Sequence, residues 1–250
     1  EILSASEVSP LLLQNAGKTV RLTLLRAGKR RQIEVTPNGE GKIGVYVRDS
    51  LSGIGTVTFY DPATGVFGGL GHGICESGGG QLMPLFKGSV TDVRLTSAVK
   101  GAPGAPGQLR GLFLPGQTGT LTANTASGVF GKIEGMPEEK ALPTAKRDEV
   151  KVGKAQILCT VRDGEKQAYD VEIEKILSRD GTEKNYLVRV TDEELLSLVG
   201  GIVQGMSGSP ILQNGRLVGA VTHVLLEDPT RGYGIYIGNM TDRLPEPIGQ

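Results

Sequence analysis

The sequence contains no tryptophan, only two histidines and two cysteines among its 250 residues, and aromatic residues make up 4% of it. Lys and Arg number 27 together, as do Asp and Glu, so the formal net charge is zero. Domains that bind nucleic acid usually carry a clustered excess of positive charge, and this balance favours no such partner. The apolar runs fall well short of the roughly 20 residues that a membrane-spanning helix needs.

The two cysteines, Cys75 and Cys159, are far apart in the sequence and neither belongs to a C-x-x-C pair. Two cysteines cannot form the disulfide framework of a small secreted domain, although one bridge is left open by the sequence. A metal site that combined them with His72 and His223 would have the spacing of no zinc motif. The simplest interpretation is two small buried side chains, and we expect no metal and no organic cofactor.

Glycine, by contrast, is abundant, with 38 residues and no three-residue collagen period. Short alternating runs bounded by turn residues predict a mainly all-β fold, a barrel or a sandwich. The expected strands lie at residues 43–47, 55–60, 66–70, 150–159 and 168–176, with further short strands within 110–135. The one convincing helix of the second half begins at Thr191, where T-D-E-E forms a capping box before several leucines.

The first 37 residues have a pattern of their own. A short helix over 4–16 precedes two alternating strands at 20–26 and 31–36, and this order resembles the C-terminal half of a PDZ domain. An ordinary hairpin packed on the main domain is the alternative. The organisation we predict is a partial PDZ-like segment, a linker and a main domain of two β-barrels, at residues 1–37, 38–42 and 43–245, with the barrels at about 43–149 and 150–245.

The most informative run is G-M-S-G-S-P at residues 205–210, which has the form G-x-S-G-x-P around Ser207. A nucleophilic serine needs a tight turn and backbone N–H groups that face the developing oxyanion, here those of Gly205 and Ser207. An Asn-Gly pair soon after predicts a hairpin, so the serine precedes a β-hairpin, as in chymotrypsin-like proteases. The G-x-S-x-G elbow of α/β-hydrolases is absent. Ser209 is the other hydroxyl within reach.

A serine nucleophile needs a base, and the two histidines are the candidates. His72 follows a predicted strand and stands between glycines in G-L-G-H-G, which places its imidazole at the mouth of a loop. His223 comes 16 residues after Ser207, on the far strand of the following hairpin. We predict His72 as the general base and His223 as a residue that lines or supports the cleft. An ordinary loop position is the alternative for His72.

The third member of such a site is a carboxylate that orients the histidine. Asp192, Asp92 and the more distant Asp61 are candidates, and spacing alone does not choose between the first two. Asp192 lies in the first turn of the predicted helix, where an acid is also favoured by the helix dipole.

Several of these motifs together resemble the stage IV sporulation protein B peptidases. The similarity rests on G-I-G-T-V-T-F-Y-D-P and G-G-L-G-H-G-I, on T-D-E-E-L-L, and on Q-G-M-S-G-S-P with its T-H-V continuation, and it spans residues 43–240. These are serine peptidases of endospore-forming bacteria with an N-terminal anchor, a PDZ domain and a trypsin-like domain. The resemblance implies a chymotrypsin-like double β-barrel with Ser207 as nucleophile, His72 as base and Asp192 as acid.

The resemblance also implies a biological role. The expected substrate is a membrane-bound regulatory protein between forespore and mother cell, whose cleavage leads to sigma-factor activation, and the enzyme is expected to cut itself as well. The expected location is outside the cytoplasm, at the forespore membrane or in the intermembrane space. Two alternatives remain open: a protease-fold scaffold that binds signalling partners, and an esterase or acyl transferase on the same barrel. The front half of a PDZ domain is not present here, which leaves PDZ-mediated control open.

Overall fold

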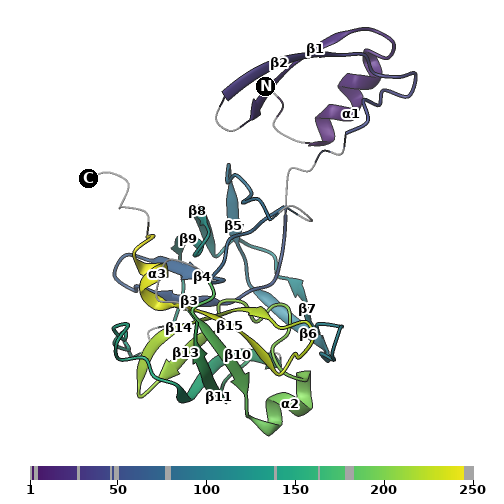
Figure 1. The fold of residues 1–250 in the computed structure, drawn as a ribbon. Helices are drawn as coiled ribbons and strands as arrows, with labels where there is room; N and C mark the ends of the chain where they lie inside the picture. The colour runs from purple at the N-terminus through teal and green to yellow at the C-terminus, as the bar shows by residue number, and fades with distance from the viewer. Residues whose placement is uncertain are drawn as a thin grey trace. The chain divides into compact units, whose positions relative to one another are not determined.

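A computed structural model describes residues 2, 5–26, 29–45, 47, 51–76, 80–137, 140–162, 164–177 and 183–244 of the chain. The fold is mainly β, as predicted, and it divides into two compact units, Glu1–Gly53 and Ile54–Gln250 (Figure 1). Among the described residues, no helix has the length and apolar character that crossing a membrane requires.

The first unit contains the helix and two strands that the sequence predicts. Helix α1 spans Ala5–Gln14, and strands β1 (Val20–Arg26) and β2 (Lys29–Val35) pair antiparallel over their full length. Residues 27–28, between these two strands, lie outside the described residues. The predicted strand at 43–47 is wrong for the residues described there, because no neighbouring strand pairs with them, and backbone groups without ladder partners do not form a strand.

The second unit begins with an open β-sheet. Its five strands lie in the order β3-β4-β9-β8-β5, and β6 and β7 form a separate hairpin. The bounds are β3 Val57–Tyr60, β4 Val66–Gly69, β5 Gly88–Val90, β6 Val93–Val99, β7 Gln108–Phe113, β8 Gly119–Thr125 and β9 Gly128–Ile133. The expected strands at 55–60 and 66–70 correspond to β3 and β4, and a loop at residues 100–107 joins β6 to β7.

The rest of the second unit is a closed six-stranded barrel in the order β10-β11-β12-β15-β14-β13. Two short helices accompany it. The bounds are β10 Gly153–Arg162, β11 Glu165–Ile176, β12 Tyr186–Val190, α2 Glu193–Val199, β13 Pro210–Gln213, β14 Arg216–Val224, β15 Arg231–Tyr236 and α3 Ile237–Thr241. The open sheet and this closed barrel together form the two β halves of a chymotrypsin-like fold, with the first half less complete than predicted.

Alternating side chains of the closed barrel form its core. Strand β10 buries every second residue, and Ile157, Ile173, Val188 and Ile211 from four strands are fully buried. Each such side chain contributes about 1.5–3 kcal/mol to stability relative to an exposed position. The barrel therefore gives a rigid frame to the loop that joins α2 to β13, which carries Ser207.

Candidate active site

The loop before β13 forms a tight turn around Ser207. The Met206 amide donates to the Val203 carbonyl (3.1 Å) and the Ser209 amide to the Met206 carbonyl (3.0 Å). The Gly208 amide donates to the Val221 carbonyl of β14 at 2.8 Å. Met206 is fully buried beneath the turn, whereas Ser207 is only half-buried. The turn is thus fixed to the barrel with the serine side chain accessible.

The first β half holds the same turn from the other side. The Thr56 amide donates to the Ser207 carbonyl, and the Thr58 hydroxyl donates to the Gly208 carbonyl, each at 2.8 Å. Gly208 has φ +93°, and a Cβ there would lie 2.1 Å from the Thr56 carbonyl oxygen and 2.6 Å from the Leu70 nitrogen. Only glycine fits this contact, which explains the second glycine of the G-x-S-G motif.

His72 follows β4 and lies where the two halves meet. A Cβ on the preceding residue, Gly71, would lie 3.0 Å from methyl groups of Thr222 and Ile235, so this loop rests directly on β14 and β15. The imidazole of His72 faces that of His223, with ring centroids 4.7 Å apart and a tilt of 36°. The structure therefore brings together the two histidines that the sequence singles out.

The ring of His72 has a defined tautomer. Its Nδ1 lies 3.0 Å from the Gly73 carbonyl oxygen. A carbonyl can only accept, so Nδ1 carries the hydrogen and donates it, which leaves the lone pair of the neutral ring on Nε2. This is the tautomer that a general base for serine requires.

His223 has a different environment. Its Nδ1 is buried and has no hydrogen-bond partner among the described residues. Burial lowers the pKa of His223 to about 4, with further lowering by His72 and Lys184 and an opposing effect of Glu183. The ring is therefore neutral at neutral pH, and an uncharged side chain packs beside His72.

The lowered pKa of His223 predicts an acid-sensitive fold. The unfolded chain takes up a proton at His223 near pH 6.5, whereas the folded chain resists this until about pH 4. The free energy of unfolding should therefore fall as the pH is lowered through this window, because the unfolded state binds more protons there. Urea unfolding of the wild-type chain and of His223→Gln at pH 7, 5.5 and 4.5 tests this. If the free energy of unfolding changed equally with pH in the wild type and in His223→Gln, the prediction would be contradicted.

Ser207 in this structure donates its hydroxyl to the Thr222 carbonyl, with Oγ 2.9 Å from the oxygen. The residue after Thr222 is His223, whose ring contacts His72. No hydrogen bond described here joins Ser207 to His72. The hydroxyl must leave the Thr222 carbonyl before it can donate to the His72 Nε2, so the arrangement is a resting one, as is common in sites without substrate.

The oxyanion-hole amides that the sequence predicts are free to bind. The amides of the flanking residues 204, 206, 208 and 209 all donate to backbone carbonyls. Those of Gly205 and Ser207 have no acceptor among the described residues. Two unpaired N–H groups on the turn of a serine match what a tetrahedral oxyanion needs.

None of the three candidate carboxylates contacts the histidine pair among the described residues. Asp192 caps helix α2 instead: its Oδ1 accepts from the Leu195 amide (3.0 Å) and its Oδ2 from the Asp170 amide (3.2 Å). The N-cap is thus Asp192 rather than Thr191, the first residue of the predicted capping box. Asp92 is exposed, and Asp61 is bonded to Thr64 and Ala63 within the β3–β4 turn, which lowers its pKa. The acid role of Asp192 stays a prediction.

Replacing Asp192 by asparagine separates its two possible roles. Asparagine caps helices as well as aspartate does, so a residue that only caps α2 would keep turnover within about tenfold of wild type. Loss of an orienting acid would lower kcat by on the order of 10⁴. Since Asp192 is predicted to be the acid that orients His72, we expect the larger loss. Steady-state turnover of a peptide substrate by Asp192→Asn distinguishes the two, with Asp92→Asn as the matched control.

Ser209 and the cysteines play no direct part in this site. Ser209 is fully buried, and its Oγ has no partner among the described residues, so a substrate cannot reach it. Cys75 is exposed, contrary to the prediction, because it lies in the loop after His72, whereas Cys159 is buried in β10 as predicted. Both thiols are free, and burial raises the pKa of the Cys159 thiol to about 12. The described residues include no group of three metal-ligating side chains.

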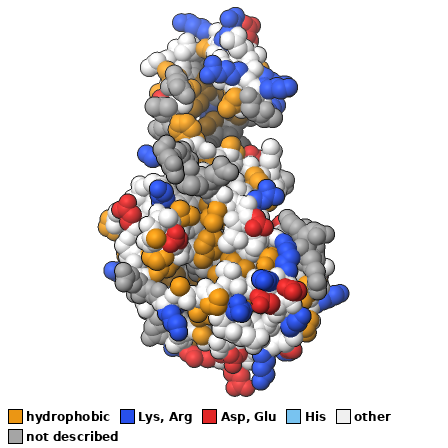
Figure 2. Space-filling view, turned by 90° about the vertical axis from the view of Figure 1, so that its left-hand side faces the viewer, with side chains coloured by type: hydrophobic (Ala, Val, Ile, Leu, Met, Phe, Trp, Pro, Cys, Tyr) orange, Lys and Arg blue, Asp and Glu red, His pale blue; other side chains and the backbone are white. Residues whose placement is uncertain are grey.

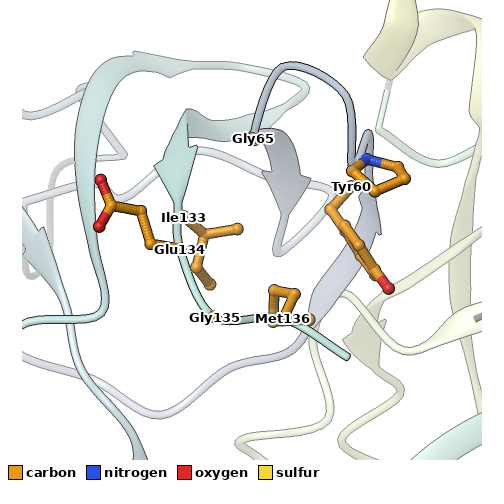
Figure 3. Close-up of a pocket in the computed structure, with 7 residues that line it drawn as sticks. Tyr60, Gly65, Ile133, Glu134, Gly135 and Met136 are labelled. Atoms are coloured by element: carbon orange, nitrogen blue, oxygen red, sulfur yellow. The ribbon is translucent and has the colours of Figure 1, made fainter. Parts of the chain in front are cut away.

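A pocket of about 350 Å³ lies elsewhere, around the β3–β4 turn and the end of β9. Figure 3 shows Glu134 and Tyr60 on opposite sides of it. His72 follows the opposite end of the β3–β4 hairpin. The lining residues include no nucleophile paired with a base, so this pocket is not the candidate active site.

These features define a serine peptidase of chymotrypsin-like architecture: a half-buried serine on a turn held between two β halves, two amides on that turn without a described acceptor, and a histidine loop that rests on Thr222, whose carbonyl accepts from the serine. The model of the SpoIVB peptidase S55 family matches residues 39–241, and the chain belongs to that family. This confirms the resemblance drawn from the motifs.

Solved structures similar to this chain include two of the Rv3671c protease. The active form, from M. tuberculosis, has 13% sequence identity and a TM-score of 0.43, and the similarity covers 98% of this chain and 90% of that one. An inactive form has 15% identity and a TM-score of 0.38, covering 55% of this chain and 70% of that one. Comparison with curated proteins found no match.

Proposed function

We propose that this protein is a serine endopeptidase in which Ser207 is the nucleophile and His72 the general base. The observation that supports this best is the pair of amides on the Ser207 turn without a described acceptor, together with a histidine whose Nδ1 donates to the Gly73 carbonyl, which leaves Nε2 as the acceptor. A binding module has no need of either feature, and together they are what acyl transfer requires.

The proposed reaction follows from these positions. The Ser207 hydroxyl leaves the Thr222 carbonyl, gives its proton to the His72 Nε2 and attacks the peptide carbonyl carbon. The amides of Gly205 and Ser207 bind the oxyanion that forms. His72 then protonates the departing amine, and a water activated by the same ring hydrolyses the acyl-enzyme. The Gly73 carbonyl accepts from the His72 Nδ1 and so favours the tautomer that can take the serine proton.

The proposed substrate is a membrane-bound regulatory protein that controls sigma-factor activation during endospore formation, and the enzyme itself is a second substrate. Membership of the family supports this role. The proposed location is the forespore membrane or the space between the two membranes. A protease-fold scaffold that binds signalling partners is the alternative, and its site would be unreactive.

A fluorophosphonate probe tests the proposed chemistry directly, because it phosphonylates serines that are activated within an oxyanion hole. We expect a single adduct on the wild-type chain, mapped by mass spectrometry to Ser207, and none on Ser207→Ala. A wild-type chain that stays unlabelled while it remains folded would favour the scaffold.

The proposed substrate class needs a cellular test. Sporulating cells that carry either the wild-type protein or Ser207→Ala can be compared by sequencing of new protein N-termini. We expect termini from a membrane-associated regulator and from the peptidase itself in the wild type alone. Identical sets of termini would contradict the proposed substrates without affecting the probe result.

A further inference from the structure

The end of the β1–β2 hairpin in the first unit exposes cationic and aliphatic side chains together. Leu25 is 73% exposed and Leu24 36% exposed, and the four cations nearest the turn are all exposed. We call this cluster the hairpin end; its described residues are Leu24, Leu25, Arg26, Lys29, Arg30 and Arg31.

The strand register shows that this exposure is not that of an ordinary apolar face. Leu25 pairs with Arg30, so it shares one face of the hairpin with Arg21, Thr23, Gln32 and Glu34. A large aliphatic side chain on a face that is otherwise polar contributes nothing to packing within the hairpin. The opposite face, with Leu24, also becomes cationic toward the turn, because Arg26 pairs with Lys29 there.

The positive charge of the hairpin end is not neutralised locally. Arg21 forms an ion pair with Glu34 further along the hairpin, at 3.1 Å. The cations of the hairpin end form no ion pair among the described residues. Residues 1–53 contain eight Lys and Arg against five Asp and Glu, although the whole chain is neutral. Figure 2 shows Lys and Arg side chains over the first unit with hydrophobic side chains between them.

We propose that the hairpin end docks on an anionic lipid surface, with Leu25 entering the headgroup layer and the four cations binding lipid phosphates. A negatively charged leaflet attracts each nearby Lys or Arg, and apolar side chains add to the binding when they enter the interface. Cations on both faces near the turn allow the hairpin to approach a membrane end-on. This goes beyond the peptidase activity and does not depend on it.

Two other anionic partners fit the hairpin end less well. Single-stranded nucleic acid is bound by aromatic side chains on which bases stack, and residues 18–35 contain none. An acidic peptide would satisfy the cations but would leave Leu25 with no role on a polar face. Only a lipid surface uses the charge and the leucine together.

Co-sedimentation of the whole chain with lipid vesicles tests the proposal. We expect binding to phosphatidylcholine vesicles with about one third phosphatidylglycerol, weakening as salt is raised, and little binding to phosphatidylcholine alone. Arg26→Gln, Lys29→Gln, Arg30→Gln and Arg31→Gln combined should weaken binding by about fivefold per cation, on the order of several hundredfold in total. Leu25→Ser alone should weaken it by about three- to tenfold.

Matched variants of the second unit serve as controls. Four exposed cations without a described ion pair, Arg94, Arg110, Lys132 and Lys154, can be changed to glutamine together, and Leu226, which is 58% exposed, can be changed to serine. We expect both controls to bind vesicles as the wild type does. Equal binding to both vesicle types, or equal losses in the two quadruple variants, would overturn the proposal. Binding to soluble polyglutamate that matches vesicle binding and is unaffected by Leu25→Ser would do so too, in favour of an acidic peptide.

Discussion

Ser207→Ala is expected to abolish peptide hydrolysis, with a loss in kcat on the order of 10⁶-fold, as expected when a serine peptidase loses its nucleophile. The fold should be retained, since Ser207 is half-buried and makes one described side-chain hydrogen bond, to the Thr222 carbonyl, whose loss costs about 1–3 kcal/mol at most. Turnover of a fluorogenic peptide, measured beside the urea midpoint of both proteins, tests this. Appreciable turnover by the variant would assign the nucleophile elsewhere.

Ser209→Ala is the matched control for this prediction. Its buried Oγ has no described partner, and an unsatisfied buried hydroxyl costs about 1–3 kcal/mol. We therefore expect wild-type turnover and a free energy of unfolding that is unchanged or slightly higher. If Ser209→Ala lost turnover while Ser207→Ala kept it, the nucleophile would be Ser209.

His72→Ala is the second change with a large expected effect. Without the base, Ser207 has no group to take its proton, and we expect kcat to fall on the order of 10⁴-fold or more. Added imidazole should restore part of the activity, because the removed ring leaves space beside His223. Rates measured across a series of imidazole concentrations provide the test.

The same measurements on His223→Ala provide the comparison for His72→Ala. His223→Ala should lower turnover only partially, since a neutral buried ring positions its neighbour rather than transferring the proton, and imidazole should not rescue it. If His223→Ala were inactive and rescued while His72→Ala stayed active, the base would be His223.

The parts of the fold that could be predicted are those with strong local signals. The alternation of β10 and β11 and the turn around the Asn-Gly pair at 214–215 predicted strands and a hairpin that the structure contains. The strand predicted at 43–47 failed because alternation shows only that a segment could pair. Whether a partner strand is present depends on distant sequence.

The candidate site likewise has parts that the sequence predicts and parts that it does not. Ser207 and His72 could be found because their side chains stand in unusual glycine-rich surroundings. The groups that position them could not: the carbonyls of Gly73 and Thr222 and the amide of Thr56 are backbone atoms, which every residue has. Asp192 illustrates the opposite problem, because one sequence position suits both a helix cap and a catalytic acid, and only tertiary contacts distinguish them.

The hydrogen bonds that hold the Ser207 turn from the first β half affect when activity can arise during synthesis. The Thr58 hydroxyl and the Gly208 carbonyl are separated by 150 residues in sequence, and Thr222, which binds Ser207, comes later still. Contacts of such high sequence separation form late in folding, since they need the chain between them to close. The Ser207 turn therefore cannot take this form until the residues up to Thr222 have left the ribosome. On partial unfolding, hydrolysis should stop before either β half has lost its strands.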